Sequence, residues 1–279
     1  MTMVGIRFDL RVPPFATTTH AEMYRACLDQ CEWADQLGLD VVVLSEHHGV
    51  TDGFMSAPVT LAAAIAGRTR KIQINIAAIL VPLHDPVRLA EQLAAVSLVS
   101  GGRIGFVAGL GYRQEEFEMA GVDRRQRGRL LEEYVGVMRR AWSGEPVNGG
   151  TLSPWPGCEG GPPVLLGAWR NPRWIAYAAK QCAGWIASGL YSSWEDLETG
   201  MRLYREAGGT NAVLANVLVD LSKTPEPGSL AERATISLVC SVDEARVRLK
   251  RIDQLGFDEV LVVSPGGALD ELERVRDFL

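Results

Sequence analysis

The feature that most constrains the fold is a series of short apolar runs that alternate with helix-like segments. Between residues 41 and 111, the runs VVVL, IQINIAAIL and IGFVA each lead into a polar or glycine-rich loop. Runs of Val, Ile and Leu without strict alternation are typical of strands buried on both faces, and intervening helices predict a parallel sheet. In such folds the loops after the carboxyl ends of the strands build the active site. Those loops hold Glu46, His47, His48, His84, Gly109 and Gly111.

The same alternation continues along the chain. We expect eight strands, at Ile6–Leu10, Val41–Leu44, Ile72–Leu80, Ile104–Ala108, Val164–Leu166, Gly184–Ser188, Val213–Leu221 and Phe257–Ser264. Helices are expected at 19–37, 58–67, 86–99, 126–142 and 241–255, from Asn171-Pro172 onward, and in a short closing segment to Leu279. Suitable helix caps are Thr19, Asp85, Asn171, the capping-box pattern of Ser241 and Glu244, and Gly38 after the first helix.

A repeated phrase supports this count of strands. Residues 35–40 and 253–258 both read Asp-Gln-Leu-Gly-x-Asp, between an expected helix and an expected strand. Repeated turns together with eight strands favour an α/β fold of the closed (β/α)8 TIM-barrel type over an open doubly wound sheet. No G-x-G-x-x-G follows the first strand, which further disfavours the open sheet. We expect one domain over residues 1–279, with the Gly- and Pro-rich residues 143–163 as an irregular lid or loop insertion.

The composition excludes several classes of function. A net charge of −6 and a pI near 5.4 argue against nucleic acid or an anionic membrane as the main partner. The sequence has no apolar run of about 18 residues that could span a membrane, and its first residues read as a strand rather than a signal segment. Five cysteines without a C-x-x-C motif indicate reduced thiols, so we expect a cytoplasmic protein.

Glu46-His47-His48 is expected to close the second strand. Because successive side chains of a strand point to opposite sides, one histidine can face the barrel mouth while its neighbour cannot. This is poor geometry for a metal centre, whose two ligands from one strand need a residue between them, so no metal site is expected. The alternative is a surface loop in which the histidines are incidental.

Three further features each allow two interpretations. Gly109-Leu110-Gly111 either turns the chain or lets a flat ring or a phosphate approach the backbone. A helix start with several arginines either binds a phosphate or is a solvated charged surface; these are Arg124, Arg125, Arg127 and Arg129. The tryptophans of the later part of the chain either wall an apolar pocket or belong to the core; these are Trp155, Trp169, Trp174, Trp185 and Trp194.

Taken together, these phrases are similar to one known group of proteins. The chain resembles the bacterial-luciferase-like (LLM) superfamily of flavin-dependent oxidoreductases, which share a (β/α)8 barrel. The matching phrases are LSEHHGVTDGFMSAP, INIAAILVPLHDPVRLAEQLAAVSLVSGGRIGFVAGLGY and GVDRRQRGRLLEE. Weaker matches are PVLLGAWRNPRWIAYAAKQCAGWI and QLGFDEVLVV. The resemblance covers nearly the whole chain and is strongest from Leu39 to Trp142.

The resemblance implies roles for individual residues. His47 holds the place of the catalytic histidine, and Ala77-Ala78 holds the place of a non-proline cis peptide under the flavin ring. The other implied cofactor-binding residues are Glu46, Gly109, Gly111, Arg127, Gly167 and Ala168. The sequence departs from luciferase itself at Ala108, where luciferase has a phosphate-binding arginine. This departure leaves room for the deazaflavin that many relatives use.

The leading interpretation is a flavin-dependent monooxygenase that acts on paired donors with O2. Reduced FMN, supplied by a separate flavin reductase, would oxidise a small organic substrate with O2, and His47 would serve as acid or base. One alternative is a coenzyme F420-dependent dehydrogenase or reductase, which passes a hydride without O2. Another is a non-catalytic flavin-binding partner subunit, and a barrel metallohydrolase is disfavoured by the histidine spacing.

A homodimer is also expected. Relatives often pair through their second and third helices, which here carry LAAAIAG and RLAEQLAAVSLVS. Small residues on a helix face allow a partner to pack closely. The alternative is that these alanines pack only on their own barrel.

Overall fold

The chain divides into two compact units, each built of parallel strands and helices. The computed structural model describes residues 2–152, 155–221, 224–225, 229–264 and 275. Unit 1 consists of the described residues of Met1–Arg7, Leu39–Val41 and Val164–Leu279, and unit 2 consists of those of Phe8–Gly38 and Val42–Pro163. In the described residues, no helix is long and apolar enough to cross a membrane.

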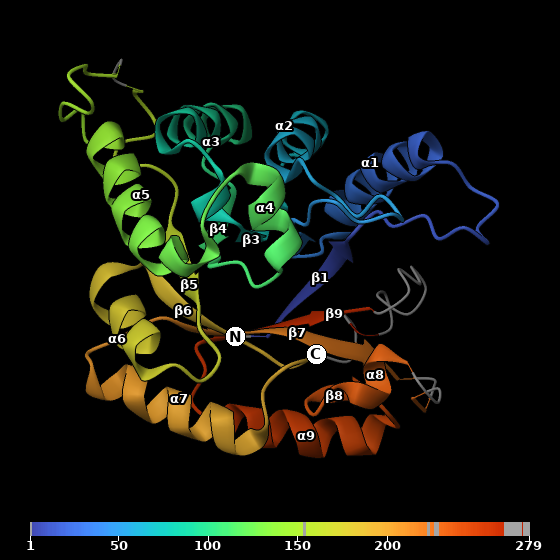
Figure 1. Cartoon of the computed structure of the whole chain (residues 1–279). Coiled ribbons are helices and arrows are strands. Elements are labelled where there is room, and N and C mark those ends of the chain that lie inside the picture. The colour runs from blue at the N-terminus through green and yellow to red at the C-terminus, as the bar shows by residue number, and fades with distance from the viewer. Residues whose placement is uncertain (1, 153–154, 222–223, 226–228, 265–274, 276–279) are drawn as a thin grey trace. The chain divides into compact units, whose positions relative to one another are not determined.

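Unit 2 carries the elements that hold the candidate site. In chain order they are α1 (His20–Leu37), β2 (Val41–Leu44, of which the last three residues belong here), α2 (Pro58–Arg68), β3 (Gln73–Ile79), η1 (Val81–Leu83), α3 (Pro86–Ser100), β4 (Ile104–Ala108), α4 (Gln114–Ala120), η2 (Arg124–Gln126) and α5 (Arg127–Trp142). β3 and β4 are parallel, with Ile74 opposite Ile104. α1, α2 and α3 pack in succession and α5 packs against α3 (Figure 1).

Local sequence signals explain where these helices begin and end. Thr19 caps α1 through a reciprocal capping box with Glu22, and Gly38 follows α1 in the left-handed conformation with φ 84°. The carboxylate of Asp85 accepts the backbone N–H of Arg88, and Pro86 occupies the first turn of α3. The caps expected at Thr19 and Asp85 and the helix end at Gly38 are therefore confirmed.

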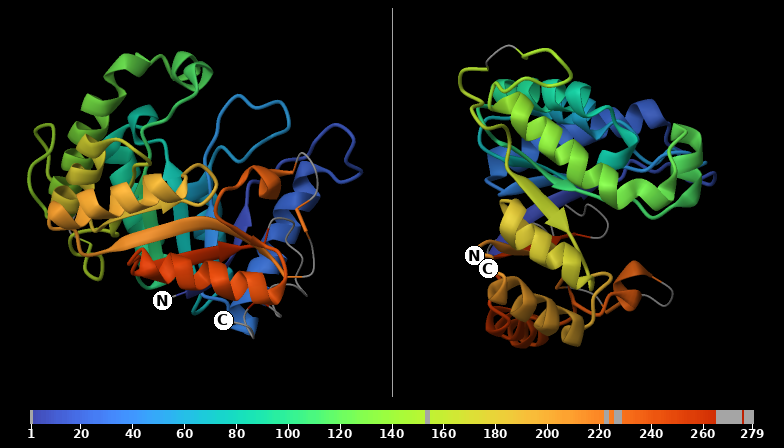
Figure 2. Two further views of the ribbon diagram at one scale, coloured as in Figure 1. Left: turned by 90° about the horizontal axis from the view of Figure 1, so that it is seen from below. Right: turned by 60° about the vertical axis from the view of Figure 1, so that its left-hand side comes forward.

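Unit 1 contains the remaining strands. Its elements are β1 (Thr2–Phe8, apart from its last residue), β5 (Val164–Gly167), α6 (Pro172–Gln181), β6 (Gly184–Ser188), α7 (Trp194–Glu206), β7 (Ala212–Asp220), α8 (Leu230–Arg233), β8 (Ser237–Val239), α9 (Val242–Gln254) and β9 (Glu259–Val263). β7 pairs in parallel with β6, β8 and β9, while β5 pairs with β6 and β1 with β9. α6 and α7 pack side by side (Figure 2).

The repeated phrase has a structural purpose within unit 1. The carboxylate of Asp40 accepts the backbone N–H of Val4 at 2.8 Å, and that of Asp258 accepts the backbone N–H of Ala212 at 2.6 Å. In both copies the aspartate thus joins the start of its own strand to a neighbouring strand. The neighbour is β1 for the first copy and β7 for the second.

Several expectations need correction. The eight expected strands correspond to β1–β7 and β9, but β1 runs from Thr2 to Phe8, and β8 is an additional short strand in the described residues. α4, α7 and α8 were not expected. α4 and α8 are too short for apolar periodicity, but α7 has Leu197, Met201 and Tyr204 at helical spacing, a signal that the sequence analysis missed. Ser241 accepts the N–H of Glu244, but the reciprocal half of the expected capping box is absent. The expected closing helix to Leu279 lies outside the described residues, apart from residue 275.

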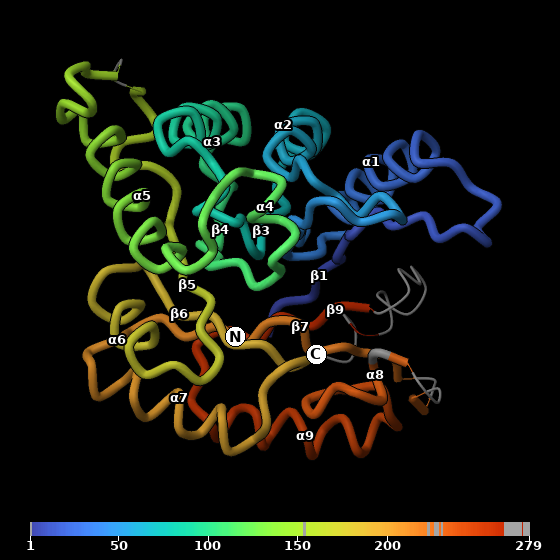
Figure 3. The backbone as a smooth tube through the Cα atoms, viewed as in Figure 1, coloured from blue at the N-terminus to red at the C-terminus, as the bar shows by residue number. Residues whose placement is uncertain are grey.

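The described residues of 143–163 form an irregular excursion, coloured yellow-green in Figure 3. The described residues of this excursion contain only an isolated bridge between Val147 and Gly150. Gly161 lies against the ring of Trp142 at the end of α5, and the carbonyl of Pro163 accepts the N–H of Phe106 in β4. These contacts connect the excursion to the end of α5 and to the middle of β4. A lid or loop insertion over residues 143–163, and a single domain over the whole chain, remain predictions.

Candidate active site

The buried carboxylate of Glu46 joins the loops that follow β2 and β3. Its Oε2 accepts the backbone N–H of Leu80 at 2.6 Å. Its Oε1 lies 3.0 Å from Nε2 of His48 and 2.7 Å from Nε2 of His84. Because β2 ends at Leu44, the Glu-His-His sequence lies in a loop and does not close the strand as expected. The loop is instead held in place by this carboxylate.

The electrostatics of this cluster favour an ionised Glu46. Burial opposes the charge, but hydrogen bonds from His48 and His84 and from the backbone of Leu80 outweigh it and lower the pKa of Glu46 to about 2. The hydrogen bond to Glu46 in turn raises the pKa of His48, against the opposing effect of burial. Because a carboxylate only accepts hydrogen bonds, both imidazoles donate to it through Nε2.

His47 interacts with a different carboxylate. Its Nδ1 lies 2.7 Å from Oε1 of Glu116, a buried residue of α4. The same oxygen accepts the backbone N–H of His48 at 3.0 Å and lies 3.6 Å from the guanidinium of Arg113. As a carboxylate, Glu116 holds the proton of His47 on Nδ1 and leaves Nε2 free of this contact. Oε2 of Glu116 is buried and has no hydrogen-bond partner among the described residues.

Two aromatic rings fix the plane of the His47 imidazole. Phe54 packs edge-to-face against it with ring centroids 4.7 Å apart, and Tyr112 does so at 5.7 Å. The side chain of His47 keeps 19% of its surface exposed. The rings of the two neighbouring histidines thus have different carboxylate partners, Glu116 for His47 and Glu46 for His48. The expected cause, strand alternation, is wrong, because neither histidine lies in β2.

Small residues lie beside this cluster at the end of β3. The peptide bond between Ala77 and Ala78 is cis, which confirms the prediction made from the resemblance. Ala77 and Ala78 are partly exposed, whereas the isoleucines of β3 are 0% exposed. Ala77 and Ala78 therefore offer a small, partly exposed surface at this strand end, which suits contact with a flat ring.

The glycines after β4 are required by packing. The N–H of Gly109 donates to the carbonyl of Ile79 at 2.8 Å, and a Cβ at Gly109 would lie 2.9 Å from the Cβ of Ala78. Gly111 has φ 73°, and a Cβ there would lie 2.8 Å from the ring of Phe117. Gly109 therefore brings the loop after β4 close to the end of β3, and Gly111 brings it close to Phe117 of α4.

The arginines at the start of α5 divide into two groups. Arg125 pairs with Asp123, and Arg129 pairs with Glu133, on the exposed surface. The half-buried Arg127 donates instead to the carbonyl of Arg124 at 3.0 Å. Arg124 in turn donates to Gln114 and to the carbonyl of Tyr112 in the loop after β4. Arg124 and Arg127 are thus the arginines of this group that are tied to the candidate site.

The predicted residues Gly167 and Ala168 lie in unit 1, at the end of β5. The N–H of Ala168 donates to the carbonyl of Ile186 at 3.4 Å, and its own carbonyl accepts the indole N–H of Trp185 at 2.6 Å. Their role toward a cofactor remains a prediction from the resemblance.

Sequence reasoning missed the residues that orient His47. Glu116 lies 69 positions away from His47, and nothing in its local sequence distinguishes it from the neighbouring Glu115 and Glu118. The one available signal was its position shortly after the glycine-rich loop that follows β4. Arg113, Phe54 and Tyr112 were also missed, for the same reason.

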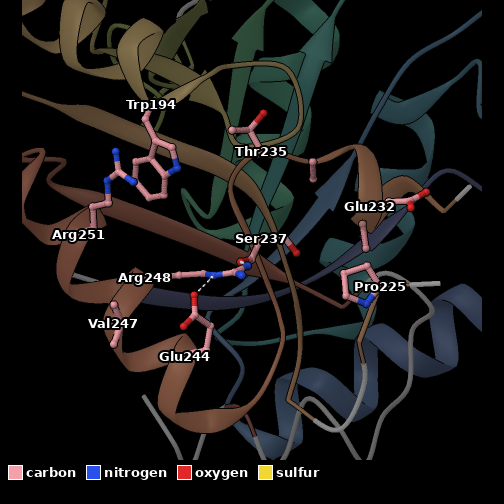
Figure 4. A pocket seen from close by; sticks show the side chains of 11 residues that line it. Trp194, Pro225, Glu232, Thr235, Ser237, Glu244, Val247, Arg248 and Arg251 are labelled. Carbon is pink, nitrogen blue, oxygen red and sulfur yellow. Dashed lines mark hydrogen bonds and ion pairs between the residues drawn. The ribbon is translucent and has the colours of Figure 1, made fainter. Parts of the chain in front are cut away.

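A cavity in unit 1 offers another place for a ligand (Figure 4). Its volume is about 450 Å³, and it is lined by residues of α7, α8, β8 and α9. Its charged groups already have protein partners: Arg248 donates to Glu244 and to the carbonyl of Ser237, and Arg251 lies 3.9 Å above the Trp194 ring. None of the predicted site residues lines this cavity, so we do not identify it as the active site.

Comparison with known proteins identifies the fold and the family. The oxygenase component of the flavin-dependent trigonelline monooxygenase of Acinetobacter baylyi is 23% identical over 68% of this chain, and the match spans 55% of that protein. The crystal structure of monooxygenase RslO1 from Streptomyces bottropensis matches with a TM-score of 0.82 at 23% identity, over 99% of this chain and 97% of that one. The FMN complex of the oxygenating constituent of 3,6-diketocamphane monooxygenase from Pseudomonas putida matches with a TM-score of 0.81 at 18% identity, over 99% and 97%.

These structural matches show a (β/α)8 TIM barrel, as the sequence predicted. The chain spans about half the length of the trigonelline relative. The family model of the luciferase-like monooxygenases matches residues 6–227, which is well over half of the chain. The chain belongs to the luciferase-like monooxygenase family.

Proposed function

We propose that this protein is a flavin-dependent monooxygenase that uses reduced FMN and O2 to oxidise a small organic substrate. One observation carries the proposal. His47 is held through Nδ1 by the buried Glu116, and its loop is bound through Glu46 to Leu80, just after the partly exposed Ala77 and Ala78 of β3. An oriented imidazole near a flat, apolar surface suits proton transfer beside a planar cofactor.

The residues present fit FMN. The partly exposed methyl groups of Ala77 and Ala78 offer a surface for one face of the ring. Gly109 and Gly111 let the loop after β4 pack against Ala78 and Phe117 beside this surface. Arg124 and Arg127 would hold the phosphate. Reduced FMN, when bound, supplies the two electrons with which O2 is activated.

His47 would move the proton in this reaction. With Nδ1 held by Glu116, Nε2 is the atom that can accept or donate a proton. Phe54 and Tyr112 restrict the rotation of the ring and shield it from water. His48 has a positioning role, because its ring is bound to Glu46 and its backbone N–H to Glu116.

Two alternatives from the sequence remain outcomes of the test. A coenzyme F420-dependent dehydrogenase would bind the deazaflavin and take up no O2. A non-catalytic flavin-binding subunit would bind FMN without turnover. The first differs from the proposal in the flavin that is bound and in O2 uptake, and the second differs in turnover.

The test is a titration of the full chain with reduced FMN and, separately, with reduced F420, following absorbance and O2 uptake. We expect binding of reduced FMN and O2 uptake above that of free FMN. Exclusive binding of F420, or FMN binding without any change in the rate or products of oxidation, would overturn the proposal.

Variants of the two histidines test the assignment of roles. His47→Ala should lower single-turnover oxidation by about a hundred- to ten-thousand-fold while FMN affinity changes little, since the proposed phosphate and ring contacts remain. Glu116→Gln should give a smaller loss and a shifted pH profile, because an amide can hold the other tautomer. His48→Ala is the matched control, and a larger loss there than at His47 would show that the roles are reversed.

We also propose the partners and the setting expected from the sequence. A separate flavin reductase would supply reduced FMN in the cytoplasm, and the protein would form a homodimer. Support for the dimer comes from α3, where Leu98 and Val99 are exposed apolar residues. Sedimentation at micromolar concentration tests this proposal, and a monomer at all concentrations would contradict it.

A further inference from the structure

Unit 1 presents a stacked pair of exposed aromatic rings. Trp169 and Tyr191 have ring centroids 4.8 Å apart and an interplanar angle of 27°. They remain 43% and 51% exposed, respectively. Large apolar rings that stay in water mark binding surfaces more often than isolated aliphatic side chains do. Neither ring belongs to the buried core of unit 1.

Both rings lie in loops that follow parallel strands. Trp169 comes two residues after β5, and Tyr191 comes three residues after β6, which pairs with β5. In a (β/α)8 barrel the loops after the carboxyl ends of the strands form the active site. Both rings therefore lie at the carboxyl end of the strands of unit 1, the end whose loops bind ligands in such barrels.

The loops that carry the two rings are well anchored. Next to Trp169, the carbonyl of Ala168 accepts the indole N–H of the buried Trp185, and Arg170 pairs with Asp196 at 3.4 Å. On the other side, Ser192 donates its N–H to the carbonyl of Ser188. These contacts hold the backbone on which the two rings are carried, which lowers the entropic cost of ordering the loops on binding.

We propose that Trp169 and Tyr191 form a platform on which a planar, unsaturated ring of the substrate stacks. This inference rests on the proposed function, because it names the substrate class of the same reaction. A flat ring can contact an indole or phenol face over its whole area, whereas a saturated ring of similar size, with axial hydrogens, cannot. Stacking of this kind should improve the affinity by about two- to tenfold over a saturated analogue.

The test measures binding without flavin or O2, so that it does not depend on turnover. The probes are 2-naphthol and its saturated counterpart decahydro-2-naphthol, whose affinities for the full chain are compared by calorimetry. We expect the native protein to bind 2-naphthol more tightly by the factor given above. Equal affinities, or no binding of 2-naphthol at millimolar concentration, would overturn the platform.

Variants identify the residues responsible. Trp169→Leu and Tyr191→Leu keep apolar bulk but remove the ring, so both should abolish the preference for 2-naphthol. Trp169→Phe should retain part of it, and Tyr177→Leu, the same substitution on α6, should leave it unchanged. The proposal is refuted if Tyr177→Leu loses the preference for 2-naphthol, or if Trp169→Leu and Tyr191→Leu both keep it. O2 uptake with reduced FMN, measured separately, shows whether the proposed function itself holds.

Discussion

The most informative perturbation is Glu46→Gln, which removes the charge shared by His48 and His84 and keeps the shape of the side chain. A pKa lowered from 4.5 to about 2 corresponds to about 3 kcal/mol of stabilisation of the ionised form. Glutamine can still accept the N–H of Leu80, so we expect a loss of about 1–3 kcal/mol in the free energy of unfolding near pH 6.

The sign of the pH dependence follows from the two shifts. Because the pKa of Glu46 is lowered in the folded state, its contribution is present above pH 4.5 and is lost as the pH falls towards 2. The pKa of His48 is raised, so its contribution is present below pH 6.5 and is lost as the pH rises through the folded-state value. The cluster should therefore stabilise the protein most between about pH 4.5 and 6.5.

The assay is urea unfolding of the native protein and the variant at pH 6 and pH 8.5. The difference in the free energy of unfolding between the native protein and Glu46→Gln should be larger at pH 6, since His48 carries less charge at pH 8.5. Glu32→Gln is the matched control, because Glu32 pairs with Arg68 on the surface and should change stability by less than about 1 kcal/mol. Equal stability of Glu46→Gln and the native protein at pH 6, or a gap that does not narrow at pH 8.5, would refute the reasoning.

Three further substitutions test the packing of unit 2 by chemical denaturation. Arg103→Ala should cost about 3 kcal/mol, because the guanidinium donates to the carbonyls of residues 66, 69, 72 and 100; a cost below 1 kcal/mol would contradict this. Gly111→Ala should cost about 1–3 kcal/mol, since φ is 73° and the new Cβ would meet Phe117; a neutral result would show that the loop relaxes freely. Thr19→Ala should cost about 1 kcal/mol through loss of the cap of α1, whereas Thr19→Ser should restore most of it.

Local signals in the sequence were sufficient for the framework of this protein. Thr19, Asp85 and Asn171 cap helices where expected, because a short polar side chain satisfies free N–H groups within its own turn. The strands Val41–Leu44 and Ile104–Ala108 have the expected bounds, since continuous apolar runs between polar loops have few other solutions. The repeated Asp-Gln-Leu-Gly-x-Asp phrase indicated the regular architecture that the structural matches show.

The chemistry of the candidate site depended on tertiary structure. His47 could be identified as a candidate from the sequence and from the resemblance, but its partner Glu116 comes from α4, a short helix without periodic apolar residues. The partnership of His48 and His84 with one carboxylate likewise joins residues separated by 38 positions from Glu46 to His84. Helix caps and strand runs act between neighbours in the sequence, whereas hydrogen bonds that orient a catalytic side chain form only after separate strand ends come together. For that reason the sequence predicted most of the strands and the capped helices in their order, whereas only the folded chain decided which carboxylate each histidine meets.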